Sequence, residues 1–237
     1  MAPFEFTPDR TFGASLPAEE RITAFLRSVY GWMCGGLAIT ALSASIIASS
    51  PAFVYAVATN RLLFWGLMIA QLGIVYVLSS RVQQLAASTA GLLFVAYSAL
   101  TGVTISFVLL AYTGESVATT FLVTAGMFGA MAAYGTTTQR SLAGFGQFLF
   151  MGVIGVVLAS IVGMFWHSDA LQFVISFIGV IVFTGLAAYD AQRLKAMALS
   201  MPNGQTGSYA IVGALALYLD FINLFLFLIR FTGNRRD

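Results

Sequence analysis

Seven long apolar runs, nearly free of charge, constrain this chain more than any other feature. A membrane-spanning helix needs about 20 mostly apolar residues. Asp220 is the only charged residue within the seven runs. Spans of a membrane β-barrel would be about 10 residues long with alternating polarity, which these runs are not. The sequence therefore predicts an all-α, polytopic membrane protein with seven transmembrane helices: Val29–Ala48, Leu62–Leu78, Gly91–Tyr112, Val117–Tyr134, Phe145–Trp166, Leu171–Tyr189 and Tyr209–Ile229.

The overall composition favours lipid as the solvent. Of the 237 residues 59% are hydrophobic and only 8% are charged, too few to cover a soluble domain of this size. The net charge of +2 comes from scattered basic residues, so no nucleic-acid partner is expected. The single cysteine, Cys34, excludes an intrachain disulfide. We find no ATP-binding loop, nucleophile elbow or metal-ligand cluster, and expect neither a cofactor nor a catalytic residue.

Three segments describe the domain organisation. Residues 1–28 hold three prolines and four acidic residues, which predicts a cytoplasmic N-terminal tail with a short amphipathic turn at 18–26 rather than a signal peptide. Residues 29–230 form the seven-helix transmembrane domain, and 231–237 a short C-terminal tail. Without targeting signals, a bacterial inner membrane is the expected location; a eukaryotic endomembrane is the alternative.

The distribution of lysine and arginine in the short loops predicts the orientation, because cytoplasmic loops carry an excess of both. With the N-terminus inside, seven basic residues lie in the cytoplasm: Arg10, Arg21, Arg27, Arg81, Arg140, Arg193 and Lys195. Four lie on the other side: Arg61, Arg230, Arg235 and Arg236. The count favours a cytoplasmic N-terminus, although the basic C-terminal end opposes it.

Asp220 is the first candidate functional residue, because an ionisable group within a membrane costs roughly 2.5–3.5 kcal/mol to insert and usually serves function. It lies in the middle of the last run, and Asn223 shares its helix face at i+3. The alternative is a protonated carboxyl that only bonds a neighbouring helix. An asparagine could make that bond without the cost of ionisation, which favours the functional reading.

Asp190 is the second candidate, at the end of the sixth run. One interpretation is an interfacial residue that pairs with Arg193 at i+3. The apolar pattern continues through Leu194 to Met197, however, so the helix is expected to continue and to hold Asp190 near the inner membrane face. The short following loop makes the last two helices antiparallel neighbours. Their carboxyls can then face each other, provided that the last helix starts below the membrane or tilts. Two facing carboxyls would share one proton. Such a pair can sense pH, relay protons or bind a hard cation.

The segment YDAQRLK, followed by LALYLDFINLFLFLIR, resembles the signature of the transmembrane Bax inhibitor motif (Bax inhibitor-like) family. The resemblance extends over all seven runs and suggests a bacterial member. It implies a seven-helix fold with the seventh helix central, and a pH-sensitive calcium leak gated by paired aspartates, which fall on Asp190 and Asp220. It also implies an arginine that engages the sixth-helix aspartate. Arg81 matches by position, but the flanking basic cluster of some bacterial members is absent.

Two polar loops complete the candidates. Glu115 lies on the outer side in the predicted orientation and could attract cations to a mouth, or it is a solvated loop acid. His167 and Asp169 flank a serine in another loop, but one histidine without a second ligand predicts no metal site.

Three function classes are compatible with a membrane bundle that carries two acidic residues. The first is a pH-sensitive cation leak channel, with calcium as the expected ion and exchange as a variant. The second is a non-conducting stress or quality-control factor that binds other membrane proteins. The third is an intramembrane aspartyl protease, an enzyme that also uses two membrane aspartates. This chain has LYLD where such proteases have a GxGD motif, and it lacks their Pro-Ala-Leu motif, so we expect no enzyme.

Overall fold

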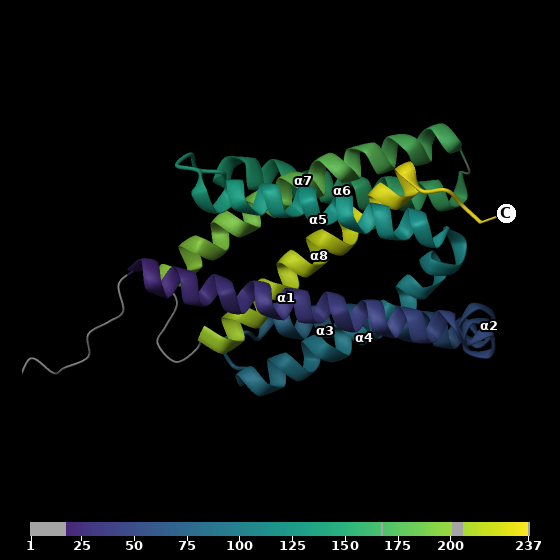
Figure 1. Ribbon diagram of the computed structural model, residues 1–237, viewed down its shortest axis with the longest axis horizontal. Coiled ribbons are helices and arrows are strands. Elements are labelled where there is room, and N and C mark those ends of the chain that lie inside the picture. The colour runs from purple at the N-terminus through teal and green to yellow at the C-terminus, as the bar shows by residue number, and fades with distance from the viewer. Residues whose placement is uncertain (1–17, 167, 201–205, 237) are drawn as a thin grey trace, which may run out of the picture.

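The computed structural model describes residues 18–166, 168–200 and 206–236, which form a bundle of helices (Figure 1). The helices of this part of the chain are α1 (Ala18–Ala48), α2 (Pro51–Thr59), α3 (Arg61–Ser80), α4 (Ala87–Ala111), α5 (Gly114–Thr137), α6 (Ala143–Phe165), α7 (Asp169–Ser200) and α8 (Thr206–Thr232). All except α2 are long and apolar enough to cross a membrane, which confirms the all-α fold with seven spans. The sixth and seventh predicted spans are α7 and α8.

The first helix begins earlier than the sequence pattern suggested. Residues 18–28, which were expected to belong to the N-terminal tail, are part of α1 and continue directly into the first span. Glu19 and Glu20 lie in its first turn, where acidic side chains favour the helix dipole. Residues 1–17 of the expected tail lie outside the described residues. The short amphipathic turn is therefore part of a longer helix.

The short helix α2 was not predicted, because nine residues are too few to span a membrane and the preceding serines suggest a loop. Pro51 occupies a first-turn position, where its fixed φ suits a helix and its missing N–H is not needed. The following α3 starts from Asn60, whose side chain accepts hydrogen bonds from the backbone nitrogens of Leu62 and Leu63 at 3.0 and 3.3 Å. This cap separates α2 from α3.

The last helix occupies the centre of the bundle. Figure 1 shows α8 crossing obliquely between α5, α6 and α7 on one side and α1, α3 and α4 on the other. It packs against α1, α4, α5 and α7. Within the most apolar window of α8 67% of the residues are buried, against 6% for α3, so α3 faces lipid and α8 does not. The seventh span is therefore central, as the family resemblance implied.

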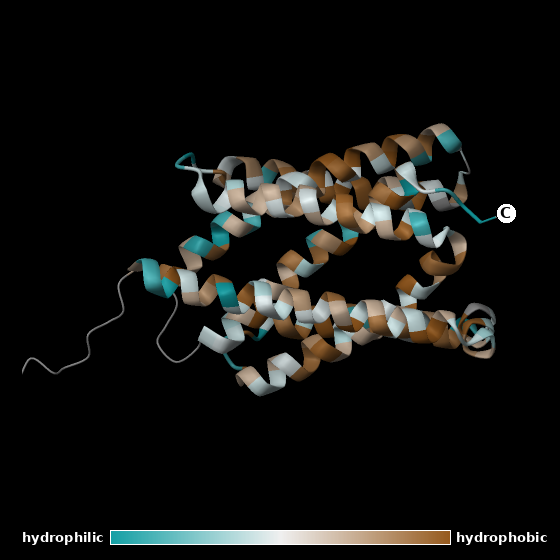
Figure 2. Cartoon of the chain, viewed as in Figure 1, coloured by the Kyte–Doolittle hydropathy of each residue, from teal (hydrophilic) through white to brown (hydrophobic). Residues whose placement is uncertain are grey.

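Hydropathy follows this arrangement. Figure 2 shows apolar residues along the bodies of the helices and hydrophilic residues gathered mainly towards the two ends of the bundle. One end holds the start of α1, the α3–α4 and α5–α6 connections, the end of α7 and the start of α8; we call it the N-terminal end. The other holds α2, the α4–α5 turn and residue 236, and we call it the C-terminal end.

Candidate functional site

The structure brings Asp190 of α7 and Asp220 of α8 together. Their carboxyl groups are in hydrogen-bonding contact in the interior of the bundle. Asp220 is 5% exposed, and Asp190 is half-buried. Because α7 continues to Ser200 and α8 begins at Thr206, both helices extend well beyond the aspartates, and α8 is tilted (Figure 1). These two features remove the difference in depth that the sequence pattern had left between the carboxyls.

Two glycine contacts fix the register of α7 against α8 on either side of the aspartates. Towards the N-terminal end, a Cβ on Gly213 of α8 would lie 2.5 Å from Cδ2 of Leu194. Towards the C-terminal end, a Cβ on Gly179 of α7 would lie 2.6 Å from the ring of Phe227. Close approach at both levels holds the antiparallel pair so that the carboxyls meet between them.

A carboxyl–carboxyl hydrogen bond requires a proton, since two carboxylates offer only acceptors. A hydrogen bond between Asp190 and Asp220 would therefore need at least one proton on the pair. Within the described residues, Oδ2 of Asp220 is buried without any hydrogen-bond partner. A buried, unsatisfied carboxyl oxygen is costly in a medium of low dielectric constant. Asp220 thus contacts Asp190 while its Oδ2 is left without a partner among the described residues.

The Asp190 segment of α7 is fastened to α5 and α6. Gln192 accepts from the backbone N–H of Leu142 at 2.8 Å and donates to the carbonyl of Arg140 at 2.9 Å, so it ties down the α5–α6 connection. Lys195 donates to the carbonyl of Thr136 at 2.7 Å, in the last turn of α5. A cation at this position also complements the dipole of that helix. These bonds make α5, α6 and this end of α7 one unit. The sequence offered no signal for them, because both side chains read as ordinary loop-proximal polar residues.

The opposite side of α8 is fastened to α1 and α4. Tyr218 lies 2.6 Å from the hydroxyl of Thr40, which in turn bonds to the carbonyls of Gly36 and Ser98 at 2.9 Å. A threonine hydroxyl has one hydrogen and carbonyls only accept, so Tyr218 donates to Thr40. Tyr218 precedes Asp220 by two positions and thus points to another face of α8. The helix is therefore clamped to α1 and α4 on one face and meets α7 through the carboxyl pair on another.

The other predicted residues are placed differently. Arg193 is exposed one turn after Asp190 and close enough to interact with it electrostatically. Arg81 is exposed at the C-cap of α3, a helix that packs on α2 and α4, and in the described part of the chain it forms no ion pair with Asp190. Asn223 donates to the carbonyl of Leu219 in its own helix at 2.8 Å. Its amide N–H is thus engaged within α8.

Glu115 lies in the first turn of α5 beside a pocket of about 360 Å³ at the C-terminal end, between α5 and α8. The pocket is lined largely by oxygen-bearing side chains: Glu115, Ser116, Thr119, Thr120, Thr232 and Asn234, with Val123 and Leu228. Next to Asp220 in α8, Phe221 packs edge-on against Phe121 and Phe128 of α5, at 5.4 and 5.6 Å between ring centroids. These aromatic contacts pack α8 against α5 beside the carboxyl pair.

The second polar loop is described only in part. His167 lies outside the described residues, and Asp169 is exposed in the first turn of α7. Among the described residues, no group of three or more histidine, cysteine, aspartate or glutamate side chains gathers in one place.

Crosslinking tests the proximity of the two aspartates. In a Cys34→Ser background, cysteines at Asp190 and Asp220 should react with a short bifunctional reagent, because their side chains are in contact. A control pair of Ser176→Cys with Asp220→Cys should not react, since Ser176 lies about 21 Å from Asp190 along α7. Mass spectrometry of the crosslinked peptides provides the measurement. If both cysteine pairs crosslinked equally, or if the 190/220 pair failed to crosslink in a folded protein, the two carboxyls would not meet.

A polytopic membrane bundle with a buried acidic pair at its central helix is the class that fold and site define. The chain matches the model of the family described as "Inhibitor of apoptosis-promoting Bax1" over residues 22–237, and it belongs to that family. Inner membrane protein YbhL of Escherichia coli (strain K12) is 52% identical over 91% of this chain and 93% of its own length. Uncharacterized proteins of Deinococcus radiodurans and Borreliella burgdorferi are 46% and 42% identical, over 92% and 90% of this chain and 93% of each relative.

Proposed function

We propose that this protein is a pH-sensitive cation leak channel of the inner membrane, with calcium as the ion and the Asp190–Asp220 pair as its gate. The observation that carries the proposal is the contact between the Asp190 and Asp220 carboxyls, which joins the central helix to α7. An ionisable pair inside a membrane bundle is costly, and a purely structural bond would be served as well by amides. Membership of the Bax inhibitor-like family and the name of the relative YbhL support the location and the class.

The gate works through the number of protons on the pair. With one shared proton, the hydrogen bond holds α7 to α8. When alkali removes that proton, two carboxylates at contact distance in low dielectric repel each other strongly. Because α8 is clamped to α1 and α4 through Tyr218, and α7 to α5 and α6 through Gln192, the repulsion acts between these two units. The helices separate there.

The charges around the pair determine the sign of the response. Arg193 faces Asp190 from the same helix, and it can pair with the carboxylate once the shared proton has left. Arg81 would have to move from its exposed position at the end of α3 to do the same. Added acid protonates both carboxyls and leaves none for an arginine, so the separated state loses its support. Cation flux therefore rises with pH.

The polar pocket beside Glu115 supplies the cation entrance in this proposal. Carboxylate, hydroxyl and amide oxygens are suitable ligands for a hard cation such as Ca²⁺. The aromatic contacts of Phe221 with Phe121 and Phe128 hold α8 against α5 beside the carboxyls. Movement of α8 relative to α5 has to part these rings for ions to pass. The proposal contains no chemical step, and we assign transport rather than catalysis.

Calcium entry into proteoliposomes tests this function. Purified protein should carry Ca²⁺ to an enclosed indicator dye faster than protein-free vesicles of the same lipid admit it. Flux equal to that of empty vesicles at every pH would contradict the channel. It would favour the non-conducting factor that binds other membrane proteins.

The proposed orientation puts the N-terminus in the cytoplasm and the pocket beside Glu115 outside. An impermeant thiol reagent applied to intact cells should spare cysteines introduced at Arg10, Arg140 and Ser200, and should label those at Glu115 and Ser168. Arg140 and Ser200 lie at the N-terminal end of the bundle, and Glu115 and Ser168 at the other, so each set should behave alike. Reversed labelling would place the pocket in the cytoplasm, and mixed labelling would contradict the seven spans.

A further inference from the structure

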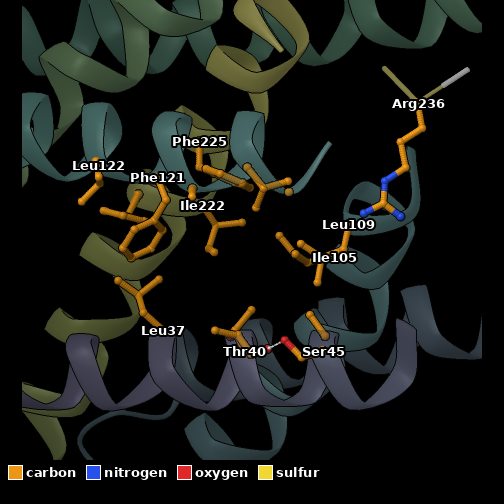
Figure 3. Close-up of a pocket in the computed structure, with 16 residues that line it drawn as sticks. Leu37, Thr40, Ser45, Ile105, Leu109, Phe121, Leu122, Ile222, Phe225 and Arg236 are labelled. Atoms are coloured by element: carbon orange, nitrogen blue, oxygen red, sulfur yellow. Dashed lines mark hydrogen bonds between the residues drawn. The ribbon is translucent and has the colours of Figure 1, made fainter. Parts of the chain in front are cut away.

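A second cavity lies beside Thr40, the hydrogen-bond partner of Tyr218. It is an open pocket of about 610 Å³ between α1, α4, α5 and α8, towards the C-terminal end, and Figure 3 shows its lining. The volume falls within the range of about 300–1,000 Å³ that is usual for small-ligand sites. The lining is apolar except for Thr40, Ser45 and Arg236. The Thr40 and Ser45 hydroxyls are engaged with backbone carbonyls, so Arg236 is the polar group that remains for a ligand.

Arg236 is held at this cavity by its backbone. Its N–H donates to the carbonyl of Ala111 at 3.0 Å, and the carbonyl of Asn234 accepts from Thr113 at 3.1 Å. Asn234 also donates to the hydroxyl of Ser116 at 3.0 Å, and Arg235 forms a β-bridge with Tyr112. This C-terminal segment is therefore fixed on the α4–α5 turn. Figure 3 shows the guanidinium of Arg236 reaching down towards Leu109 and the apolar lining.

The chemistry of the cavity excludes two occupants. Water needs two to four polar partners, which an apolar wall does not offer. A cation would meet the guanidinium, and in the described residues Arg236 forms no ion pair that would neutralise it. A ligand of this cavity can be tested by a binding measurement alone, without a measurement of ion flux.

We propose that this cavity binds one acyl chain of an anionic phospholipid, with the phosphate of the headgroup on Arg236. The cavity lies among spanning helices, where acyl chains are the surrounding solvent, and its apolar walls suit a hydrocarbon chain. Arg236 follows the last spanning helix at the end of the bundle, where we expect lipid headgroups, and a guanidinium binds phosphate oxygens in a bidentate manner. Chain and headgroup are thus recognised by one continuous surface.

Native mass spectrometry of the full-length protein in detergent tests the headgroup contact. Titrated with phosphatidylglycerol or with phosphatidylcholine of the same chains, the wild-type protein should bind one phosphatidylglycerol more tightly. Arg236→Gln should lower that affinity about tenfold, to the level of phosphatidylcholine. The matched control is Arg235→Gln, which removes the same charge from a neighbouring residue that does not line the cavity, and it should retain the preference. Equal losses in both variants would mean diffuse attraction of lipid by charge, which overturns the proposal.

A second pair of variants tests the chain. Ala118 on α5 is exposed and lines the cavity, so Ala118→Phe fills the space without disturbing the core. It should weaken binding of both lipids. Ala125→Phe lies on the same helix at an exposed position outside the cavity and should bind as the wild type does. Undiminished phosphatidylglycerol binding by Ala118→Phe would overturn the proposal even if Arg236→Gln failed to fold.

Discussion

Replacing Asp220 by asparagine is expected to abolish the pH response of cation flux while leaving the fold intact. An amide neither ionises nor gives up a proton, yet it can still donate a hydrogen bond to Asp190, so α7 and α8 stay together at every pH. Asp190→Asn should have the same effect, since the two carboxyls act as one unit. Calcium flux into proteoliposomes across a range of pH provides the measurement. The wild-type rate should climb with pH, and both variants should stay flat.

The matched control for these variants is Asp169→Asn. Asp169 is an exposed acid on α7, the helix of Asp190, but it lies in the first turn, far from the pair. It should keep the wild-type pH response. Infrared difference spectroscopy adds a direct readout, because the protonated carboxyl should give a C=O band that disappears on alkalinisation and is absent in Asp220→Asn. An unchanged pH profile in both pair variants would show that the gate lies elsewhere.

Replacing Gly135 by alanine should have the largest effect on stability. A Cβ at this position would collide with the backbone carbonyl of Ala188, and backbone cannot rotate away as a side chain can. The whole of α5 would have to move from α7, two residues before Asp190. We expect a loss of about 3 kcal/mol or more in the free energy of unfolding, at the upper end of overpacking costs. Thermal unfolding in detergent, followed by size-exclusion chromatography, measures it.

Gly129→Ala on the same helix is the control. A Cβ there has no atom within 4 Å, so the variant should be neutral, or more stable by about 0.5–1 kcal/mol through a better helix propensity. If Gly135→Ala unfolds at the same temperature as Gly129→Ala, then α5 and α7 do not approach as closely as described. In that case α5 would not hold the Asp190 segment of α7 in place.

The fold could be predicted from the sequence because lipid imposes a simple requirement. Every span had to be a long apolar run, and Asp220 stood out as the single charge within those runs. The helix ends were less well defined. The start of α1 at Ala18 lies in a polar segment that hydropathy cannot distinguish from a tail, and α2 is shorter than any span. The early start of α1 and the presence of α2 depend on local capping and on packing, which the length of an apolar run does not encode.

The site could be predicted only where charge marked it. Asp190 and Asp220 were found because carboxyls are rare within apolar helices. The residues that position them were missed. Tyrosine and threonine are common in any membrane helix, and only the 2.6 Å contact between Tyr218 and Thr40 identifies their role. Arg81 shows the reverse: its sequence position suggested a contact with Asp190, but α3 packs on α2 and α4 and leaves it exposed. Which residues lie near the aspartates depends on contacts between segments that are distant in the sequence.

A pH-step experiment on the wild-type protein in proteoliposomes tests the central claim most directly. Calcium entry is followed while the external medium is stepped from acidic to alkaline and back. The account predicts that entry accelerates on alkalinisation, as the shared proton leaves Asp190 and Asp220, and slows again on reacidification. Entry that does not change with pH, or that is faster in acid, would contradict the shared-proton gate.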